Sequence, residues 1–112
     1  MAQYTQHFTA NFEDLLSYVD DSVMRGSFSA SREGGSNFSL GDVRCATRVY
    51  ERYSYIGSNR LSLTVTLFGR DGDIQLTAIT AGGSQALMFK INTWGEEAFL
   101  EKFVSQLEKY LH

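Results

Sequence analysis

The chain has 112 residues, of which 43% are hydrophobic and 21% charged, and its formal net charge is −3. A chain of this length forms one domain with a core of its own. The acidic balance disfavours a general nucleic-acid binder, which needs a basic excess to neutralise phosphates. No apolar run approaches the roughly 18–20 residues of a membrane span, and the N-terminus lacks the basic and apolar segments of a signal peptide. We therefore expect a cytoplasmic protein that binds neither nucleic acid nor membrane.

The first strong local signal is an amphipathic helix over Phe12–Arg25. Asn11 is suited to the N-cap, acidic residues follow in the first turn, and apolar residues recur at helical spacing. Gly26 is expected to end the helix at the C′ position. The adjacent Asp20 and Asp21 are predicted to be solvated, because neighbouring helix residues do not face each other.

Weaker strand signals lie on both sides of this helix. Residues 4–9 alternate loosely and are predicted to form a short edge strand. Residues 27–32 alternate serine with other residues, which predicts a half-buried strand. Residues 33–37 contain a Gly-Gly pair and are predicted to be a loop, but not a phosphate-binding one, since no Lys-Ser or Lys-Thr follows.

Residues 43–81 are predicted to form three consecutive antiparallel strands, around which the rest of the chain is arranged. Asp71-Gly72 is typical of a two-residue hairpin, because both positions favour positive φ. This turn pairs Arg70 with Asp73 and sets the register of the second hairpin. The inward-facing pairs are then Leu67 with Leu76, Val65 with Ala78, and Leu63 with Thr80. The other face pairs Phe68 with Gln75, Thr66 with Thr77, and Thr64 with Ile79.

The turn near Gly57-Ser58-Asn59 is longer and defines its register less sharply. Pairing Tyr55 with Leu61 places Tyr53 opposite Leu63 and Val49 opposite Leu67. The strand over residues 43–55 then points these side chains inward: Val43, Cys45, Thr47, Val49, Glu51 and Tyr53.

Glu51 is the one inconsistency in this arrangement, because it falls opposite Val65 on the face expected to be buried. The strand could bulge there and turn the side chain outward. The position could lie beyond the end of a covering helix and be solvated. The carboxylate could instead be buried and functional, with a raised pKa.

The predicted outward face is rich in arginine and threonine, and it supplies the candidate binding residues. A polar sheet face of this kind is commonly just solvated. It could also bind or dimerise, with an anionic or aromatic partner, since Arg and Tyr are enriched in binding hot spots. The candidate residues are Arg44, Arg48, Tyr50, Arg52, Thr66 and Thr77.

The C-terminal part is predicted to contain a strand over residues 86–91, after a break at residues 81–84. A capping box follows, with Thr93 as N-cap and Glu96 at N3. The final helix is predicted over residues 94–111, with a broad apolar stripe that belongs to the core. A pocket between this helix and the sheet is an alternative, and its candidate residues are Glu51, Phe89 and Trp94.

Signatures of catalysis and of cofactor binding are missing from the sequence. His7 and His112 lie near the termini, and no zinc-ligand spacing exists. Cys45, the only cysteine, is predicted to be an inert core thiol in a reducing compartment. We therefore predict no metal, no cofactor and no enzymatic activity.

The elements add up to a two-layer α+β fold. We expect an antiparallel sheet of four to six strands in the order β-α-β4/5-α. The N-terminal helix and the long C-terminal helix should pack on one face of the sheet, because each has a single apolar stripe. This order is similar to a reduced helix-grip or TATA-binding-protein-like arrangement, a likeness of fold that carries no function.

The sequence also resembles a family of small bacterial proteins, of Firmicutes type, that is a domain of unknown function. The resemblance rests on Gly82-Gly83-Ser84 through Trp94-Gly95-Glu96-Glu97-Ala98-Phe99-Leu100. It extends to Gly41-Asp42-Val43-Arg44-Cys45 and Tyr53-Ser54-Tyr55-Ile56-Gly57. It implies a bacterial origin and a fold, and it transfers no active site.

Three functions remain open from the sequence. The first is a non-enzymatic interaction module that binds an unidentified protein or forms a homodimer through the outward sheet face. The second is a binder of a small apolar or aromatic ligand, held between the sheet and the C-terminal helix. The third is an enzyme that uses Glu51 as acid or base, with Arg48 or Arg52 holding an anion.

Overall fold

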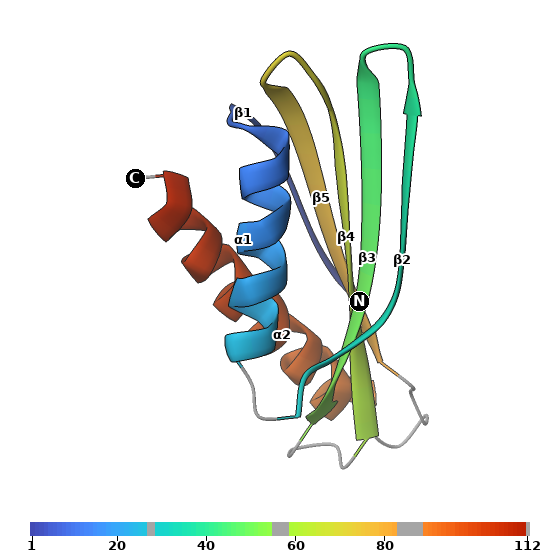
Figure 1. Cartoon of the computed structure of the whole chain (residues 1–112). Helices are drawn as coiled ribbons and strands as arrows, with labels where there is room; N and C mark the ends of the chain where they lie inside the picture. Colours follow the sequence, from blue (N-terminus) through green and yellow to red (C-terminus); the bar gives the residue numbers. More distant parts are fainter. Residues whose placement is uncertain (27–28, 55–58, 83–88, 112) are drawn as a thin grey trace.

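The computed structural model describes residues 1–26, 29–54, 59–82 and 89–111. It is an α+β fold with one antiparallel sheet, as predicted (Figure 1). The elements are β1 (Ala2–Thr9), α1 (Phe12–Arg25), β2 (Ser31–Leu40), β3 (Val43–Ser54), β4 (Asn59–Arg70), β5 (Asp73–Gly82) and α2 (Phe89–Leu111). The strand order across the sheet is β1-β5-β4-β3-β2, so β1 and β2 form its two edges.

Both helices lie on the same face of the sheet, as expected from their single apolar stripes (Figure 1). The core is the layer between them, where burial of aliphatic and aromatic side chains supplies the main stabilisation. No helix of the described residues is both long and apolar enough to cross a membrane. The large hydrophobic side chains that are fully buried in the described core are Leu15, Val19, Tyr50, Leu61, Leu63, Val65, Leu67, Ile74, Leu76 and Leu107.

Helix α1 has the predicted bounds because its N-terminal cap is satisfied locally. The Asn11 side chain accepts a hydrogen bond from the Asp14 N–H at 3.0 Å. Gly26 ends the helix as predicted, but as the C-cap residue rather than at C′, with a right-handed φ of −77°. The Gly26 N–H donates to the carbonyls of Ser22 and Val23 and so caps the last turn.

The β4–β5 hairpin has the register that its turn predicts. Asp71 and Gly72 have φ values of 53° and 83°, which is the positive-φ pair of a two-residue hairpin. Arg70 lies opposite Asp73 and Leu67 opposite Leu76. The side chains of Leu63, Val65, Leu67, Leu76 and Ala78 therefore point into the core, as predicted.

The predicted register of β3 against β4 is wrong. Leu63 lies opposite Tyr50 rather than Tyr53, a shift of three residues. Because side chains alternate between faces, an odd shift inverts the whole strand. Ala46, Arg48 and Tyr50 therefore point toward the helices, and the odd-numbered residues of β3, including Glu51, point away. The end of the predicted strand at Tyr55 and most of the predicted turn lie outside the described residues.

Strand β2 replaces both elements predicted for this region. The predicted loop over residues 33–37 is part of the strand, which continues to Leu40 and pairs with β3 along its length. A register shift between Arg32 and Gly34 marks a bulge at Glu33. Only the last part of the predicted strand over residues 27–32 is strand, and residues 27–28 lie outside the described part of the chain.

Helix α2 begins earlier than predicted. Residues 89–91, predicted as strand, are helical, and Thr93 lies inside the helix rather than at its N-cap. Glu96 is buried and its carboxylate pairs with the Met1 amino group. The predicted apolar stripe is confirmed in the described part of α2, since Phe99, Leu100, Phe103 and Leu107 are buried. Residues 83–88 lie outside the described chain, and with them the start of the predicted strand.

Candidate functional site: the uncovered face of the sheet

The face of the sheet opposite the helices has no element packed on it among the described residues (Figure 1). We call it the outer face. The registers of the four strand pairs define the residues that share it, because directly opposed residues point to the same side. Its middle consists of these side chains: Gln3, Thr5, Ser36, Phe38, Val43, Cys45, Thr47, Val49, Thr64, Thr66, Phe68, Gln75, Thr77 and Ile79.

A row of threonines crosses the centre of the outer face from strand to strand. Thr47 lies opposite Thr66, Thr66 opposite Thr77, and Thr77 opposite Thr5. The hydroxyls of Thr5 and Thr77 are 3.4 Å apart. β-branched side chains of one size give this part of the sheet an even surface of methyl and hydroxyl groups.

Larger apolar side chains lie next to this row, toward the β2–β3 and β4–β5 turns. Phe38, Cys45 and Phe68 are direct neighbours across β2, β3 and β4. The two phenylalanines are 61% and 52% exposed, and Leu40 near the end of β2 is 84% exposed. Cys45 is half-buried on this face, so its prediction as a core thiol is wrong. Clustered exposed aromatics of this kind are typical of an interaction site.

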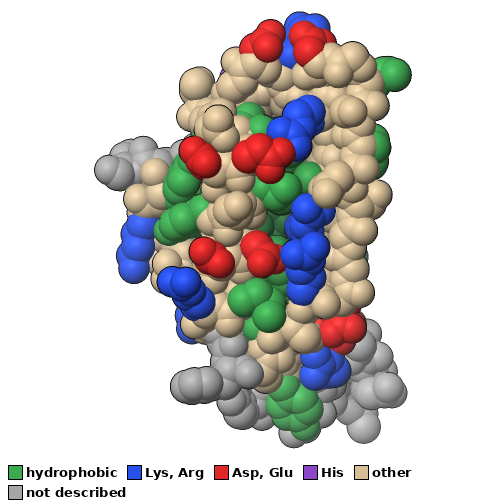
Figure 2. All heavy atoms as spheres, viewed as in Figure 1, with side chains coloured by type: hydrophobic (Ala, Val, Ile, Leu, Met, Phe, Trp, Pro, Cys, Tyr) green, Lys and Arg blue, Asp and Glu red, His purple; other side chains and the backbone are tan. Residues whose placement is uncertain are grey.

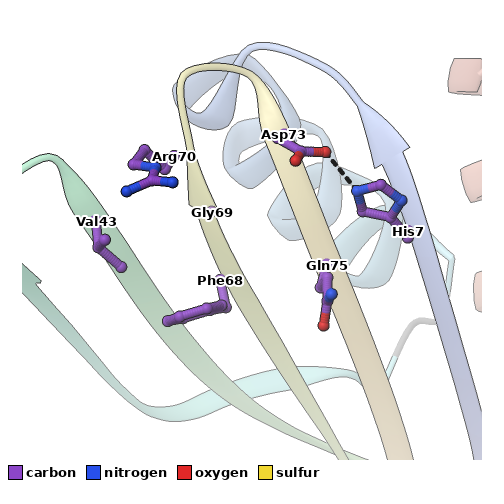
Figure 3. A pocket seen from close by; sticks show the side chains of 7 residues that line it. All are labelled: His7, Val43, Phe68, Gly69, Arg70, Asp73 and Gln75. Atoms are coloured by element: carbon purple, nitrogen blue, oxygen red, sulfur yellow. Dashed lines mark hydrogen bonds and ion pairs between the residues drawn. The ribbon is translucent and has the colours of Figure 1, made fainter.

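A shallow hollow of about 290 Å³ lies at the same end of the outer face. Figure 3 shows that Phe68 and Arg70 border it from β4, while Asp73 and Gln75 border it from β5. His7 of β1 pairs with the Asp73 carboxylate across the strand boundary. Arg70, although directly opposite Asp73 in the sheet, is turned toward Val43 instead.

Charged residues of the outer face lie at its two ends and not in its centre. His7, Arg70 and Asp73 occupy one end. At the other end Glu51 pairs with Arg60, whose Nε is 2.8 Å from the Glu51 carboxylate. Glu51 is therefore a partly exposed rim residue with a salt bridge, which contradicts its predicted place on the buried face.

The predicted binding residues do not form one site, because the structure divides them between the two faces. Thr66 and Thr77 are on the outer face. Arg44, Arg48, Tyr50 and Arg52 alternate on the helix-facing side of β3. The prediction that these six residues share one face is wrong because it assumed the shifted register of β3 against β4.

The arginines on the helix side mostly pack against the helices. Figure 2 shows Lys and Arg side chains running beside Asp and Glu side chains on this side of the molecule. Arg44 pairs with Glu13, and its guanidinium carbon is 4.4 Å from the centre of the Phe12 ring. Arg52 stacks in the same way, 4.4 Å from the Phe99 ring. Cation–π contacts of this kind attach the helices to β3.

Tyr50 joins β3 to α1 through a partly buried hydrogen bond. Its hydroxyl donates to Asp20 at 3.0 Å, and Arg32 lies 3.5 Å from the same carboxylate oxygen. Burial and the Asp20 carboxylate both raise the pKa of Tyr50 well above its ordinary value, although Arg32 and Arg48 oppose the shift. Asp20 is thus a structural acceptor and only partly solvated, whereas its neighbour Asp21 is exposed as predicted.

Arg48 is only 7% exposed and crosses beneath β2. Its Nη1 donates to the Thr47 carbonyl at 2.9 Å and to the Ser36 carbonyl at 3.4 Å. A Cβ at Gly35 would lie 3.0 Å from the Arg48 side chain. Gly35 therefore makes room for Arg48, and this contact links β2 to β3 where no helix covers the sheet.

The predicted pocket between the sheet and α2 has little support among the described side chains. Those of Phe89 and Trp94 lie outside that set. The cavity bordered by Arg52, Phe99 and Phe103 has a volume of about 10 Å³, which is about the space of one water molecule. A wider, open hollow of about 470 Å³ lies between β1 and α2, but it is bordered by other residues than the predicted ones. Within the described ranges, no group of three His, Cys, Asp or Glu side chains is arranged to hold a metal ion.

The chain matches a protein family for which no function is described. The family of unknown function DUF6054 matches residues 1–111. The chain belongs to this family. No curated protein matches the sequence.

Among solved structures, this DUF6054 chain is similar to PA94 from Pseudomonas aeruginosa, a protein of unknown function described as a regulator candidate. The identity is 11% and the TM-score 0.53, with 88% of the DUF6054 chain and 81% of PA94 covered. A likeness at this identity shows a shared fold and no more.

The outer face also contains residues that the sequence pattern does not predict there: Phe38, Leu40, Val43, Cys45, Thr47 and Val49. Phe38 and Leu40 lie in no predicted strand, and the other four are predicted on the buried face of β3. A signal was present, since Phe38 and Leu40 alternate with Ser39 and Asn37. The Gly-Gly pair before them concealed it, because glycines commonly interrupt strands.

Proposed function

We propose that this protein is a non-enzymatic interaction module and that its outer face docks on the outer face of a second copy. The observation that carries the proposal is the arrangement of that face. An uncharged centre of threonine and apolar side chains is bordered by charges at its two ends. Protein interfaces have this anatomy, with charge depleted in the centre and a polar rim.

The size of the outer face also fits a pair of identical chains. The sheet has five strands, and β2 and β5 each contain 10 residues. Strand spacing of about 4.8 Å and a rise of about 3.3 Å per residue give a face of roughly 24 by 33 Å. The product is about 800 Å², which is the area that each partner contributes to a standard stable interface.

A second copy is favoured over an oppositely charged partner, because the centre of the face offers no charge to complement. Two copies related by a two-fold axis would bring the same patch together from both sides. Phe38 and Phe68 would supply the aromatic contacts that contribute most to such interfaces.

The test is the mass of the protein in solution as a function of concentration, measured by sedimentation equilibrium. The wild type should self-associate, and Thr66→Lys should weaken this association, since it places a charge in the centre of the threonine row. Ser105→Lys, at an exposed position on α2, is the matched control and should behave like the wild type. Equal association of Thr66→Lys and wild type would refute docking through this face.

A further inference from the structure

The second unpartnered surface of the molecule is the free edge of β2. β2 is paired with β3 from Ser31 to Leu40, and among the described residues no strand lies on its other side (Figure 1). Its backbone N–H and C=O groups on that side are therefore available to another strand. The opposite edge, β1, is packed against α2 and half of its side chains are partly buried, whereas nearly all of β2 is exposed.

Natural edge strands usually carry features that prevent further pairing, such as charges, prolines, bulges or a covering element. β2 has such features only at its start, where Arg32 and Glu33 are charged and the ladder bulges. Residues 34–40 contain no charge, no proline and no bulge. The β3 ladder and the Arg48 side chain beneath Gly35 hold this segment extended.

We propose that residues 34–40 pair with the same residues of a second copy in an antiparallel, two-fold symmetric ladder. The register follows from the two ends of the segment. The bulge limits it on one side, and the turn at Gly41, with a φ of 63°, limits it on the other. A two-fold axis must superimpose the segment on itself, so it passes through the middle residue, Asn37.

This register places complementary side chains opposite one another. On the outer face Leu40 meets Gly34 of the second copy, and Phe38 meets Ser36. A large apolar side chain beside a strand glycine covers backbone that the glycine leaves exposed, as in aromatic rescue of edge glycines. Leu40 and Phe38 are the two most exposed apolar side chains of β2, so the ladder would bury them.

The edge and the outer face share the side chains of Ser36 and Phe38, but the ladder forms through backbone groups of the β2 edge, so this inference does not depend on the proposed function. Edge pairing joins two sheets into one continuous sheet of ten strands, with all four helices on one side. Face docking stacks two sheets. If both occur, four chains form two stacked continuous sheets with the helices outside.

The experiment uses charge at the two-fold axis. Asn37 is exposed and points to the helix side of the sheet, away from the outer face. In Asn37→Lys two lysines would face each other, and in Asn37→Glu two glutamates would. Each variant should associate about tenfold more weakly than wild type through this interface. Mixing the two variants in equal amounts should restore association, because lysine then faces glutamate.

Ser39→Lys and Ser39→Glu form the matched control pair, on the same strand and the same side of the sheet. In the proposed register Ser39 faces Gly35 of the second copy, so mixing these variants should restore nothing. The ladder is supported if mixing restores association for the two Asn37 variants and not for the two Ser39 variants. Unchanged association of Asn37→Lys, or a mixture no stronger than its components, overturns the ladder.

The same measurements separate the two interfaces. A wild type of four chains should become two chains with either Thr66→Lys or Asn37→Lys, and one chain with both. Loss of association in Thr66→Lys with no effect of Asn37→Lys overturns edge pairing and leaves face docking intact. The reverse result overturns face docking and leaves the edge ladder. A monomeric wild type at high micromolar concentration overturns both.

Discussion

The two faces of the sheet are built from the same strands, yet they differ in what holds their side chains. On the helix side nearly every residue of β4 and β5 is buried, and the charged groups of β3 are paired, stacked or bonded to carbonyls. On the outer face the side chains contact mainly their neighbours across the strands. The difference places most of the stabilising contacts on one face and leaves the other face without an element packed on it among the described residues.

The largest expected contrast is between two adjacent residues of β4. Leu67 is fully buried and Phe68 is half exposed. Leu67→Ala should lower the free energy of unfolding by about 2–5 kcal/mol, because it leaves a cavity in the core. Phe68→Ala should cost less than about 1 kcal/mol in dilute protein, although it removes more atoms.

Denaturant unfolding of both variants at low micromolar concentration measures this contrast. Repeating it at high concentration sharpens the comparison. If the outer face docks, the loss caused by Phe68→Ala should grow with concentration, because association stabilises the folded wild type by mass action. Equal losses for Leu67→Ala and Phe68→Ala at low concentration would contradict the division of roles between the faces.

The next largest effect concerns the Tyr50–Asp20 hydrogen bond on the helix side. Tyr50→Phe should cost about 1–3 kcal/mol, since it leaves a partly buried carboxylate with one donor fewer. The pKa of Tyr50 is raised in the folded state, so above about pH 10 the unfolded chain releases this proton and the folded chain retains it. Stability should therefore fall as pH rises through this range, by up to about 1.4 kcal/mol per pH unit from this group.

The measurement is the unfolding free energy of wild type and Tyr50→Phe between pH 8 and pH 11. The two curves should converge as pH rises above about 10, because only the wild type has Tyr50 to ionise. Parallel curves would show that Tyr50 ionises equally in the folded and unfolded chains. The difference curve removes the contribution of the other tyrosines.

A smaller contrast lies within β2, between neighbouring glycines that point to opposite faces. A Cβ at Gly35 would lie 3.1 Å from the Thr47 carbonyl and 3.0 Å from Arg48, whereas a Cβ at Gly34 meets nothing within 4 Å. Gly35→Ala should cost about 1–2 kcal/mol through crowding. Gly34→Ala should be neutral or stabilising by about 0.5 kcal/mol, because alanine restricts the unfolded chain.

Thermal unfolding of the two alanine variants measures which of them loses more stability. Hydrogen exchange of residues 34–40 gives a second readout, since Gly35→Ala should speed exchange by displacing Arg48. If Gly34→Ala lost more stability than Gly35→Ala, Arg48 would not hold β2 against β3.

The smallest effect is expected at the rim of the outer face. Glu51→Gln removes the salt bridge to Arg60, but exposed pairs of this type contribute only about 0–1 kcal/mol. The variant should unfold within about 0.5 kcal/mol of wild type and should keep its self-association. A much larger loss in chemical denaturation would indicate a buried role for Glu51, which the structure does not give it.

Local signals predicted the parts of the fold that depend on neighbours in sequence. Asn11 marks the start of α1, and Asp71-Gly72 sets the β4–β5 register, because the geometry of a two-residue turn leaves one pairing. These two features were enough to place most of the core. The outer position of Thr66 and Thr77 followed from the same turn.

The errors arose where a distant contact overrides a local signal. The sequence between β3 and β4 has no dipeptide that defines a turn, so it does not set the register of these two strands. The predicted register is three residues off, and it therefore places Arg48, Tyr50 and Glu51 on the wrong face. The capping pattern at Thr93 and Glu96 was overridden by a helix that begins earlier and buries Glu96. Local propensity is a weak indicator when tertiary packing is available.

The sequence by itself determined the α+β class, the helix α1, and the alternation of buried and exposed residues along β4 and β5. These depend on periodicity and turn chemistry, which act over a few residues. Only the tertiary structure decided which way β3 faces and that the Gly34-Gly35 segment is an edge strand. Both depend on pairing between strands, where a free-energy difference summed over many distant contacts selects one register among several.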